Sequence, residues 1–159
     1  PYLMDGSFKL TESFAIHDYV ADKWCPALKG TTPQHRAQVN MMANVIKDLK
    51  SGITGPSYGG MMDKIEEAIA KMLPAIVSFL GEKKFLVGNS PTWVDFYFFE
   101  LVNLMFYLKQ DLFTLYPVLE KYVKSMHSLP KLGAYLADPK CFDKNLPFNN
   151  KMAKFGATV

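Results

Sequence analysis

A β-hairpin is predicted at the start of the chain, and no later segment predicts another strand. Residues 2–4 and 8–10 are short strand-like segments on either side of Asp5-Gly6, a dipeptide that strongly favours a tight hairpin turn. Two strands alone are marginally stable at best in water. We therefore expect the hairpin to complete its sheet with strands that lie outside this sequence.

Helical periodicity dominates the chain after the hairpin. A helix is predicted to start near Ser13 and to stop before Pro26, and residues 25–33 are predicted to form a linker because they hold two prolines and a glycine. Apolar residues then recur at helical spacing in five further segments, 34–51, 61–80, 93–108, 117–128 and 131–137. The sequence therefore predicts a β-β-α unit followed by an all-helical domain.

Two segments are predicted to lack regular helix. Residues 51–60 hold four glycines and a proline, so we expect a loop or a frayed helix end there. The tail, residues 139–159, is expected to be irregular and held to the surface by its aromatic residues, which are Phe142, Phe148 and Phe155.

The helix predicted over residues 93–108 is expected at the centre of the helical domain, because it is apolar nearly all round. Thr92 and Asp95 have the three-residue spacing of a capping box, with Thr92 as the N-cap. We expect this pair to be structural. The segment is shorter than the roughly 20 residues that a membrane span needs, and Asp95 and Glu100 interrupt it.

Composition favours a folded intracellular protein and disfavours several classes of function. The 159 residues are 49% hydrophobic and 21% charged, which is enough apolar material for a sizeable core. The net charge is +3 and Arg36 is the only arginine, so a nucleic-acid interface is not expected. The sequence shows neither a signal peptide nor metal-ligand spacing. The sequence is compatible with a disulfide between Cys25 and Cys141 and also with two free thiols.

Two longer motifs resemble segments of the cytosolic glutathione transferases. The first, residues 1–16 (PYLMDGSFKLTESFAI), is similar to the family's segment from its cis-proline into its glutathione-binding helix. The second, residues 85–96 (FLVGNSPTWVDF), is similar to the family's signature around a buried N-capping box. Leu73-Pro74 and the tail residues 150–156 most resemble the mu and sigma classes.

This resemblance implies a fold in two parts. Residues 1–24 would be the last part of a thioredoxin-like, glutathione-binding domain, residues 25–33 a linker, and residues 34–159 the all-helical C-terminal domain. The family's first β-α-β unit and its catalytic Tyr, Ser or Cys precede the point where this sequence begins. We therefore expect no catalytic residue here, and a native chain longer by about 50–60 residues, the size of one such unit with its connections.

The resemblance also implies a function, which is conjugation of glutathione to electrophilic apolar substrates or isomerisation of a prostanoid-type substrate. Glutathione would be the co-substrate, no metal would be needed, and the protein would be a cytoplasmic homodimer without a nucleic-acid or membrane partner. The alternative is a non-catalytic transferase-fold subunit that binds or supports other chains in a larger protein assembly, because a fold does not fix a function.

Ser13 and Glu12 are the first candidate glutathione ligands. The resemblance implies that Ser13 and its N–H hold the γ-glutamyl carboxylate, which suits the positive end of a helix. The alternative is a plain N-cap serine worth about 1 kcal/mol of helix stability. Glu12 would pair with the γ-glutamyl ammonium, and its alternative is an exposed acid favoured by the helix dipole.

Three further residues match positions of the family's sites. Pro1 matches the cis-proline. Asp48 matches an acid that reaches across the dimer to the partner's glutathione, and its alternative is a solvated helix acid beside Lys47 and Lys50. Tyr58 matches a tyrosine of the second-substrate pocket, but its glycine-rich surroundings depart from the helix that the family usually has there.

Overall fold

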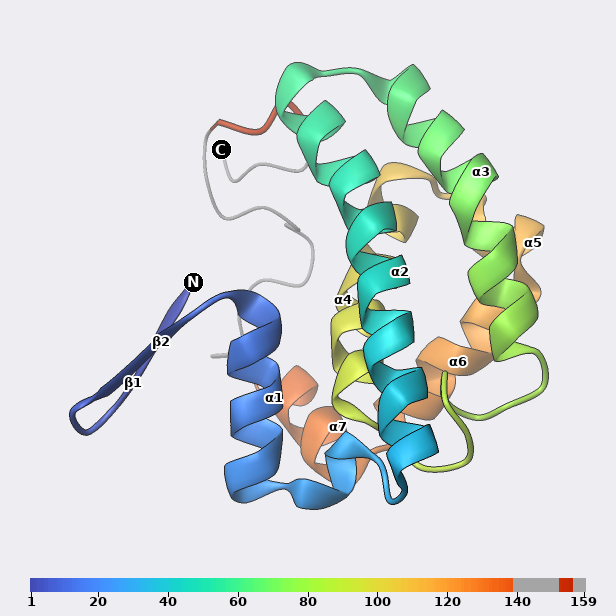
Figure 1. The fold of residues 1–159 in the computed structure, drawn as a ribbon. Helices are drawn as coiled ribbons and strands as arrows, with labels where there is room; N and C mark the ends of the chain where they lie inside the picture. The colour runs from blue at the N-terminus through green and yellow to red at the C-terminus, as the bar shows by residue number, and fades with distance from the viewer. Residues whose placement is uncertain (139–151, 156–159) are drawn as a thin grey trace.

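The computed structural model describes residues 1–138 and 152–155 (Figure 1). A β-hairpin and helix α1 come first along the chain, and a bundle of helices follows. This order confirms the predicted fold class. The contacts predicted for Phe142 and Phe148 lie outside the described residues.

The hairpin consists of β1 (Tyr2–Asp5) and β2 (Phe8–Thr11), which pair antiparallel with Leu3 opposite Leu10. Gly6 makes the turn with a φ of 60°, a left-handed conformation that glycine adopts without steric cost. In Figure 1 the hairpin projects away from the helical bundle. The predicted hairpin is therefore confirmed, with each strand one residue longer than expected.

Helix α1 (Ser13–Trp24) follows the hairpin and holds it in place. The hydroxyl of Tyr19 donates a hydrogen bond of 2.6 Å to the carboxylate of Asp5, and Lys23 forms an ion pair with the same carboxylate. The rings of Phe8 and Tyr19 lie 5.0 Å apart. The linker after α1 contains one short 3-10 helix, η1 (Pro26–Lys29), which the sequence did not predict.

The bundle contains two long helices that pack along each other, α2 (Pro33–Gly59) and α3 (Met62–Leu80), and a third, α4 (Trp93–Leu108), that contacts both α1 and α2. Three shorter helices complete the described part, α5 (Leu112–Leu115), α6 (Pro117–His127) and α7 (Pro130–Ala137). Helix α4 supplies a large share of the buried core, namely Trp93, Val94, Phe98, Phe99, Leu101, Val102, Leu104 and Met105. Its predicted central place is confirmed.

The prediction for residues 51–60 was wrong, because α2 continues as a helix to Gly59. The apolar stripe of α2 extends through this stretch, where Ile53 and Ser57 are fully buried. Burial of this face outweighs the low helix propensity of the glycines. The helix ends one turn after Pro56, at Gly60, whose φ of 72° forms a left-handed C-cap.

Part of the C-terminal tail lies against the end of α2. The N–H of Lys154 donates a 2.9 Å hydrogen bond to the carbonyl of Ser57. Ala153 is buried, and Phe155 packs against the core. The predicted anchoring role of Phe155 is therefore confirmed.

Candidate functional site

Helix α1 begins with an unusual backbone at Glu12. This residue is the helix N-cap, with φ 70° and ψ 119°, and it is the one non-glycine residue with positive φ within residues 1–138 and 152–155. Such conformations cost about 1–3 kcal/mol and cluster at functional sites. The side chain of Glu12 is exposed. Ser13 follows Glu12 as the first residue of α1.

The start of α1 has hydrogen-bonding capacity to offer a ligand. The first bond of the helix runs from the N–H of Ile16 to the carbonyl of Glu12, at 2.9 Å, so the N–H groups of the three preceding residues have no helical acceptor. Among residues 1–138 and 152–155 no side chain caps this end, and the first turn of α1 carries no acid. Since Ser13 is half-buried and is not the N-cap, the simple capping interpretation of this serine is wrong. The arrangement suits an anion.

An aromatic cluster joins the first half of α1 to α4. The ring of Phe14 lies 5.6 Å from that of Trp93 and 5.0 Å from that of Tyr97, the second pair meeting edge to face at 82°. His17, one turn later, lies 5.7 Å from Trp93 and 5.8 Å from Tyr97. Aromatic pairs at these separations add about 0.5–1.5 kcal/mol each beyond area burial. The cluster therefore fixes the position of α1 against the bundle.

Two lysines of α2 complete this junction. The ammonium of Lys47 lies 5.6 Å from the centre of the Phe14 ring, and that of Lys50 lies 4.5 Å from the centre of the Tyr97 ring. Both separations are within reach of a cation–π interaction. The sequence prediction missed this cluster, because its members are far apart along the chain and each alone has the pattern of an ordinary core or surface residue.

Burial perturbs the charged groups at the junction. Burial lowers the pKa of His17, the positive charge of Lys50 lowers that pKa further, and the buried Nδ1 of His17 has no hydrogen-bond partner in the described part of the chain. Burial also lowers the pKa of Lys50, although the negative charge of Glu100 opposes the shift. Burial raises the pKa of Glu100, and Lys50 opposes that shift in turn. The packing of α1 against α2 and α4 is thus most stable when His17 is neutral.

The other predicted ligands lie on different elements. Pro1 precedes β1 at an exposed position, and Asp48 is exposed on α2 next to Lys47. Tyr58 lies in the last turn of α2 and is 42% exposed. Tyr58 therefore lies in helix and not in the predicted loop. The carbonyl of its neighbour Ser57 accepts the N–H of Lys154, so Tyr58 is close to the C-terminal segment.

Thr92 and Asp95 form the predicted capping box, and both are buried. The N–H and the hydroxyl of Thr92 donate to one carboxylate oxygen of Asp95, at 2.7 and 3.0 Å, and the N–H of Leu86 donates to the other at 2.8 Å. The hydroxyl of Tyr122 donates to the backbone carbonyl of Asp95 at 2.8 Å. Burial raises the pKa of Asp95, while the hydrogen bonds to its carboxylate from Leu86 and Thr92 favour the charged form. The predicted capping-box geometry is therefore present at the start of α4.

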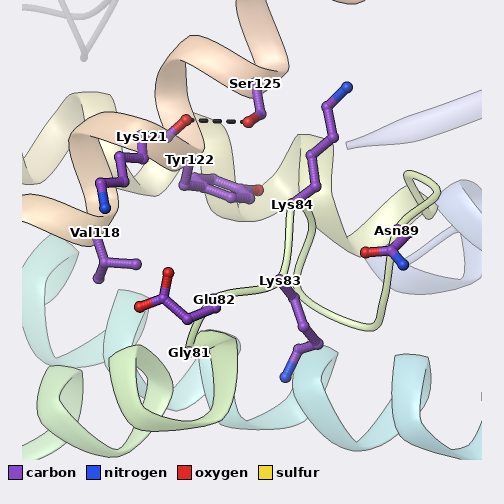
Figure 2. Close-up of a pocket in the computed structure, with 9 residues that line it drawn as sticks. All are labelled: Gly81, Glu82, Lys83, Lys84, Asn89, Val118, Lys121, Tyr122 and Ser125. Atoms are coloured by element: carbon purple, nitrogen blue, oxygen red, sulfur yellow. Dashed lines mark hydrogen bonds between the residues drawn. The ribbon is translucent and has the colours of Figure 1, made fainter.

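A surface hollow of about 290 Å³ lies elsewhere, between the loop after α3 and helix α6 (Figure 2). Its lining contains none of the predicted ligand residues. Three lysines line it, Lys83, Lys84 and Lys121, but Figure 2 shows their ammonium groups pointing away from one another. The three lysines of the hollow therefore do not point toward a common site where an anion would bind.

Two other kinds of site are absent from the part of the chain that the structure describes. No group of His, Cys, Asp and Glu side chains there could hold a metal ion. No helix there is both long enough and apolar enough to span a membrane.

Comparison with known proteins gives consistent matches. Residues 60–139 match the family model for the glutathione S-transferase C-terminal domain. The chain is 32% identical over 160 residues to glutathione S-transferase class-mu 26 kDa isozyme 51 of Fasciola hepatica, covering 98% of this chain and 72% of that protein. It is 31% identical to glutathione S-transferase Mu 5 of Rattus norvegicus, covering 98% and 69%. The chain thus spans about seven tenths of the length of these relatives.

Solved structures match the fold as well. The structure of the glutathione S-transferase Blo t 8 superposes with a TM-score of 0.81 at 24% identity, over 98% of this chain and 75% of that one. The structure of rat hPGDS complexed with a quinoline superposes with a TM-score of 0.78 at 24% identity, over 92% and 75%. At this identity the two superpositions establish the fold alone.

Proposed function

Because the chain belongs to the glutathione S-transferase family, we propose that the protein binds glutathione and transfers it to small electrophilic, apolar compounds. The observation that carries the proposal is the start of α1, where the left-handed backbone of Glu12 precedes Ser13 and the helix end has no side-chain cap within the described residues. A strained backbone beside N–H groups that lack a helical acceptor suits the carboxylate end of a peptide ligand.

In this proposal Ser13 binds the γ-glutamyl carboxylate through its hydroxyl and backbone N–H, and the exposed carboxylate of Glu12 pairs with the γ-glutamyl ammonium. Pro1 would lie beside the cysteinyl part of glutathione. Asp48 would act on the glutathione of the partner subunit in a homodimer. Tyr58, at the end of α2, would line the pocket for the electrophile.

Holding both reactants in one cleft is the main contribution that these residues would make to the chemistry. Two bound and oriented reactants behave as an effectively intramolecular pair, which removes much of the entropic part of the barrier. Residues 1–24 would belong to the glutathione-binding domain and residues 34–159 to the domain that forms the second-substrate wall, with residues 25–33 joining them.

The proposal can be tested on the native polypeptide that contains this sequence. We expect retention on immobilised glutathione and turnover of a chromogenic electrophile. Binding without turnover would instead support the alternative, a non-catalytic subunit of a larger assembly. Failure to bind glutathione at all would refute the proposed function.

A matched pair of serine variants tests the assignment of Ser13. Ser13→Ala should weaken glutathione binding about tenfold, through loss of one hydrogen bond to a charged group. Ser125→Ala is the control, because its hydroxyl donates to the carbonyl of Lys121 on α6, away from α1. Calorimetric titration with glutathione measures both. Equal affinity of Ser13→Ala and the wild type would remove Ser13 from the site.

A further inference from the structure

The ring of Phe14 occupies a position where three helices meet. Phe14 belongs to α1 and directly follows Ser13. Its ring contacts Trp93 and Tyr97 of α4, with centroid separations of 5.6 and 5.0 Å, and the ammonium of Lys47 on α2 lies 5.6 Å from its centre. We call these four residues the Phe14 clamp. The clamp holds the first turn of α1 from two sides.

The first turn of α1 depends on these side-chain contacts, because the segments directly before and after it in the chain do not hold it against the bundle. On its N-terminal side lies Glu12 in a left-handed conformation, preceded by the hairpin that projects from the bundle (Figure 1). The covalent connection to the bundle, through η1 and the rest of residues 25–33, leaves from the opposite end of α1. Side-chain contacts must therefore set where this turn lies relative to α2 and α4.

We propose that Phe14 is a positioning residue for the glutathione site. Its ring, fixed by Trp93, Tyr97 and Lys47, sets the place and direction of the adjacent Ser13 hydroxyl and N–H. The inference rests on the proposed role of Ser13, and it adds that the helical domain positions the glutathione ligands of α1 through the ring beside them, that of Phe14, while His17 packs on the same two rings one turn later. Small displacements of a ligand group carry large costs in binding and catalysis.

The rings of Phe14 and Tyr97 lie at the edge of the core, and this separates their role from general stability. Phe14 and Tyr97 are only partly buried, whereas the centre of the bundle consists of fully buried residues such as Phe98 and Val102. Loss of the Phe14 ring should therefore loosen the contact of α1 with α4 while the bundle itself stays folded.

The test uses the native polypeptide with Phe14→Leu, which removes the ring but keeps an apolar side chain. We expect glutathione affinity to fall about fivefold to twentyfold and the KM for glutathione to rise in parallel, because the ligand groups lose their alignment. We expect kcat at saturating glutathione to stay within about twofold of the wild type. Unchanged glutathione affinity, or an equal loss in kcat with no rise in KM, would overturn the proposal.

Two further variants control for structural damage. Phe113→Leu removes a ring of similar size that stacks on Phe106 at 4.4 Å, away from α1, and it should leave glutathione affinity unchanged. Tyr97→Phe keeps the edge-to-face ring, so it should behave as the wild type, whereas Tyr97→Leu should reproduce the effect of Phe14→Leu. If Phe113→Leu weakens glutathione binding as much as Phe14→Leu does, the specific role of Phe14 is overturned.

A second readout keeps the clamp testable apart from the proposed function. Hydrogen exchange of the Ile16 amide, which donates to the carbonyl of Glu12, reports the order of the first turn without any ligand. Faster exchange in Phe14→Leu than in the wild type supports the clamp, and equal exchange overturns it. If the wild type fails to bind glutathione, the proposed function is refuted, while the exchange result still decides whether Phe14 positions this turn.

Discussion

The Asp95→Ala replacement removes a carboxylate that ties three segments of the chain together. Asp95 is fully buried, and its two carboxylate oxygens accept the N–H groups of Leu86 and Thr92 at 2.8 and 2.7 Å. Alanine would leave both N–H groups without an acceptor. Each orphaned buried group costs about 1–3 kcal/mol, so we expect a loss of about 2–6 kcal/mol in the free energy of unfolding.

A loss of this size is a large part of the total stability, since domains are typically stable by only about 5–15 kcal/mol. For a protein of this length it corresponds to a fall in Tm of about 5–20 °C. Urea unfolding followed by circular dichroism, together with thermal melts, measures both quantities. Asp95→Asn should lie between alanine and wild type, because one oxygen acceptor remains.

The matched control is Asp63→Ala. Asp63 is also an acid in the first turn of a long helix, α3, but it is exposed, so its loss should cost less than about 1 kcal/mol. If Asp95→Ala unfolds within about 1 kcal/mol of the wild type, or no more easily than Asp63→Ala, the buried capping box is not the stabilising element inferred from its hydrogen bonds.

Two further predictions concern the helix packing and the junction at α1. A Cβ at Gly52 would lie 2.9 Å from the Cβ of Ala68 on α3, so Gly52→Ala should destabilise the protein by about 1–3 kcal/mol in urea unfolding. A Cβ at Gly55 would meet nothing within 4 Å. Gly55→Ala should therefore stabilise the protein by up to about 1 kcal/mol, because alanine favours helix more than glycine does. Equal effects of the two would contradict the close approach of α2 and α3. Burial and Lys50 hold the pKa of His17 below its ordinary 6.5 in the folded protein. The unfolded chain therefore binds more protons below this pH, and the free energy of unfolding should rise as the pH is raised toward and through 6.5. His17→Leu should remove that part of the pH dependence, and an unchanged profile would show that His17 does not cause it.

The features that the sequence predicted best depend on local chemistry. Asp5-Gly6 predicted the hairpin turn, and Thr92 with Asp95 predicted the first residue of α4, because turns and caps involve residues a few positions apart. The end of α2 was missed for the opposite reason. The glycines after Ser51 disfavour helix locally, but burial of Ile53 against the core decides the outcome.

In the candidate site, too, the sequence predicted the features set by nearby residues and missed those set by distant ones. The resemblance of residues 1–16 placed Ser13 at the start of a helix, and the structure has it there. No sequence rule predicts a left-handed backbone at Glu12, because a glutamate has no local preference for it. The contacts of Phe14 with Tyr97 and Lys47 join segments that are distant along the chain, so only the fold could reveal them.

The contact between the tail and the end of α2 has a consequence for the order of folding. The hydrogen bond from Lys154 to Ser57 closes a loop of about a hundred residues, whereas the bonds of Asp95 reach only to Leu86 and Tyr122. Long loops close late, after the contacts that are near in sequence have formed. The capping-box network should thus form earlier than the contact at Ser57, and that contact should open more easily than the network, so that the end of α2 at Tyr58 can fluctuate while the centre of the bundle stays closed.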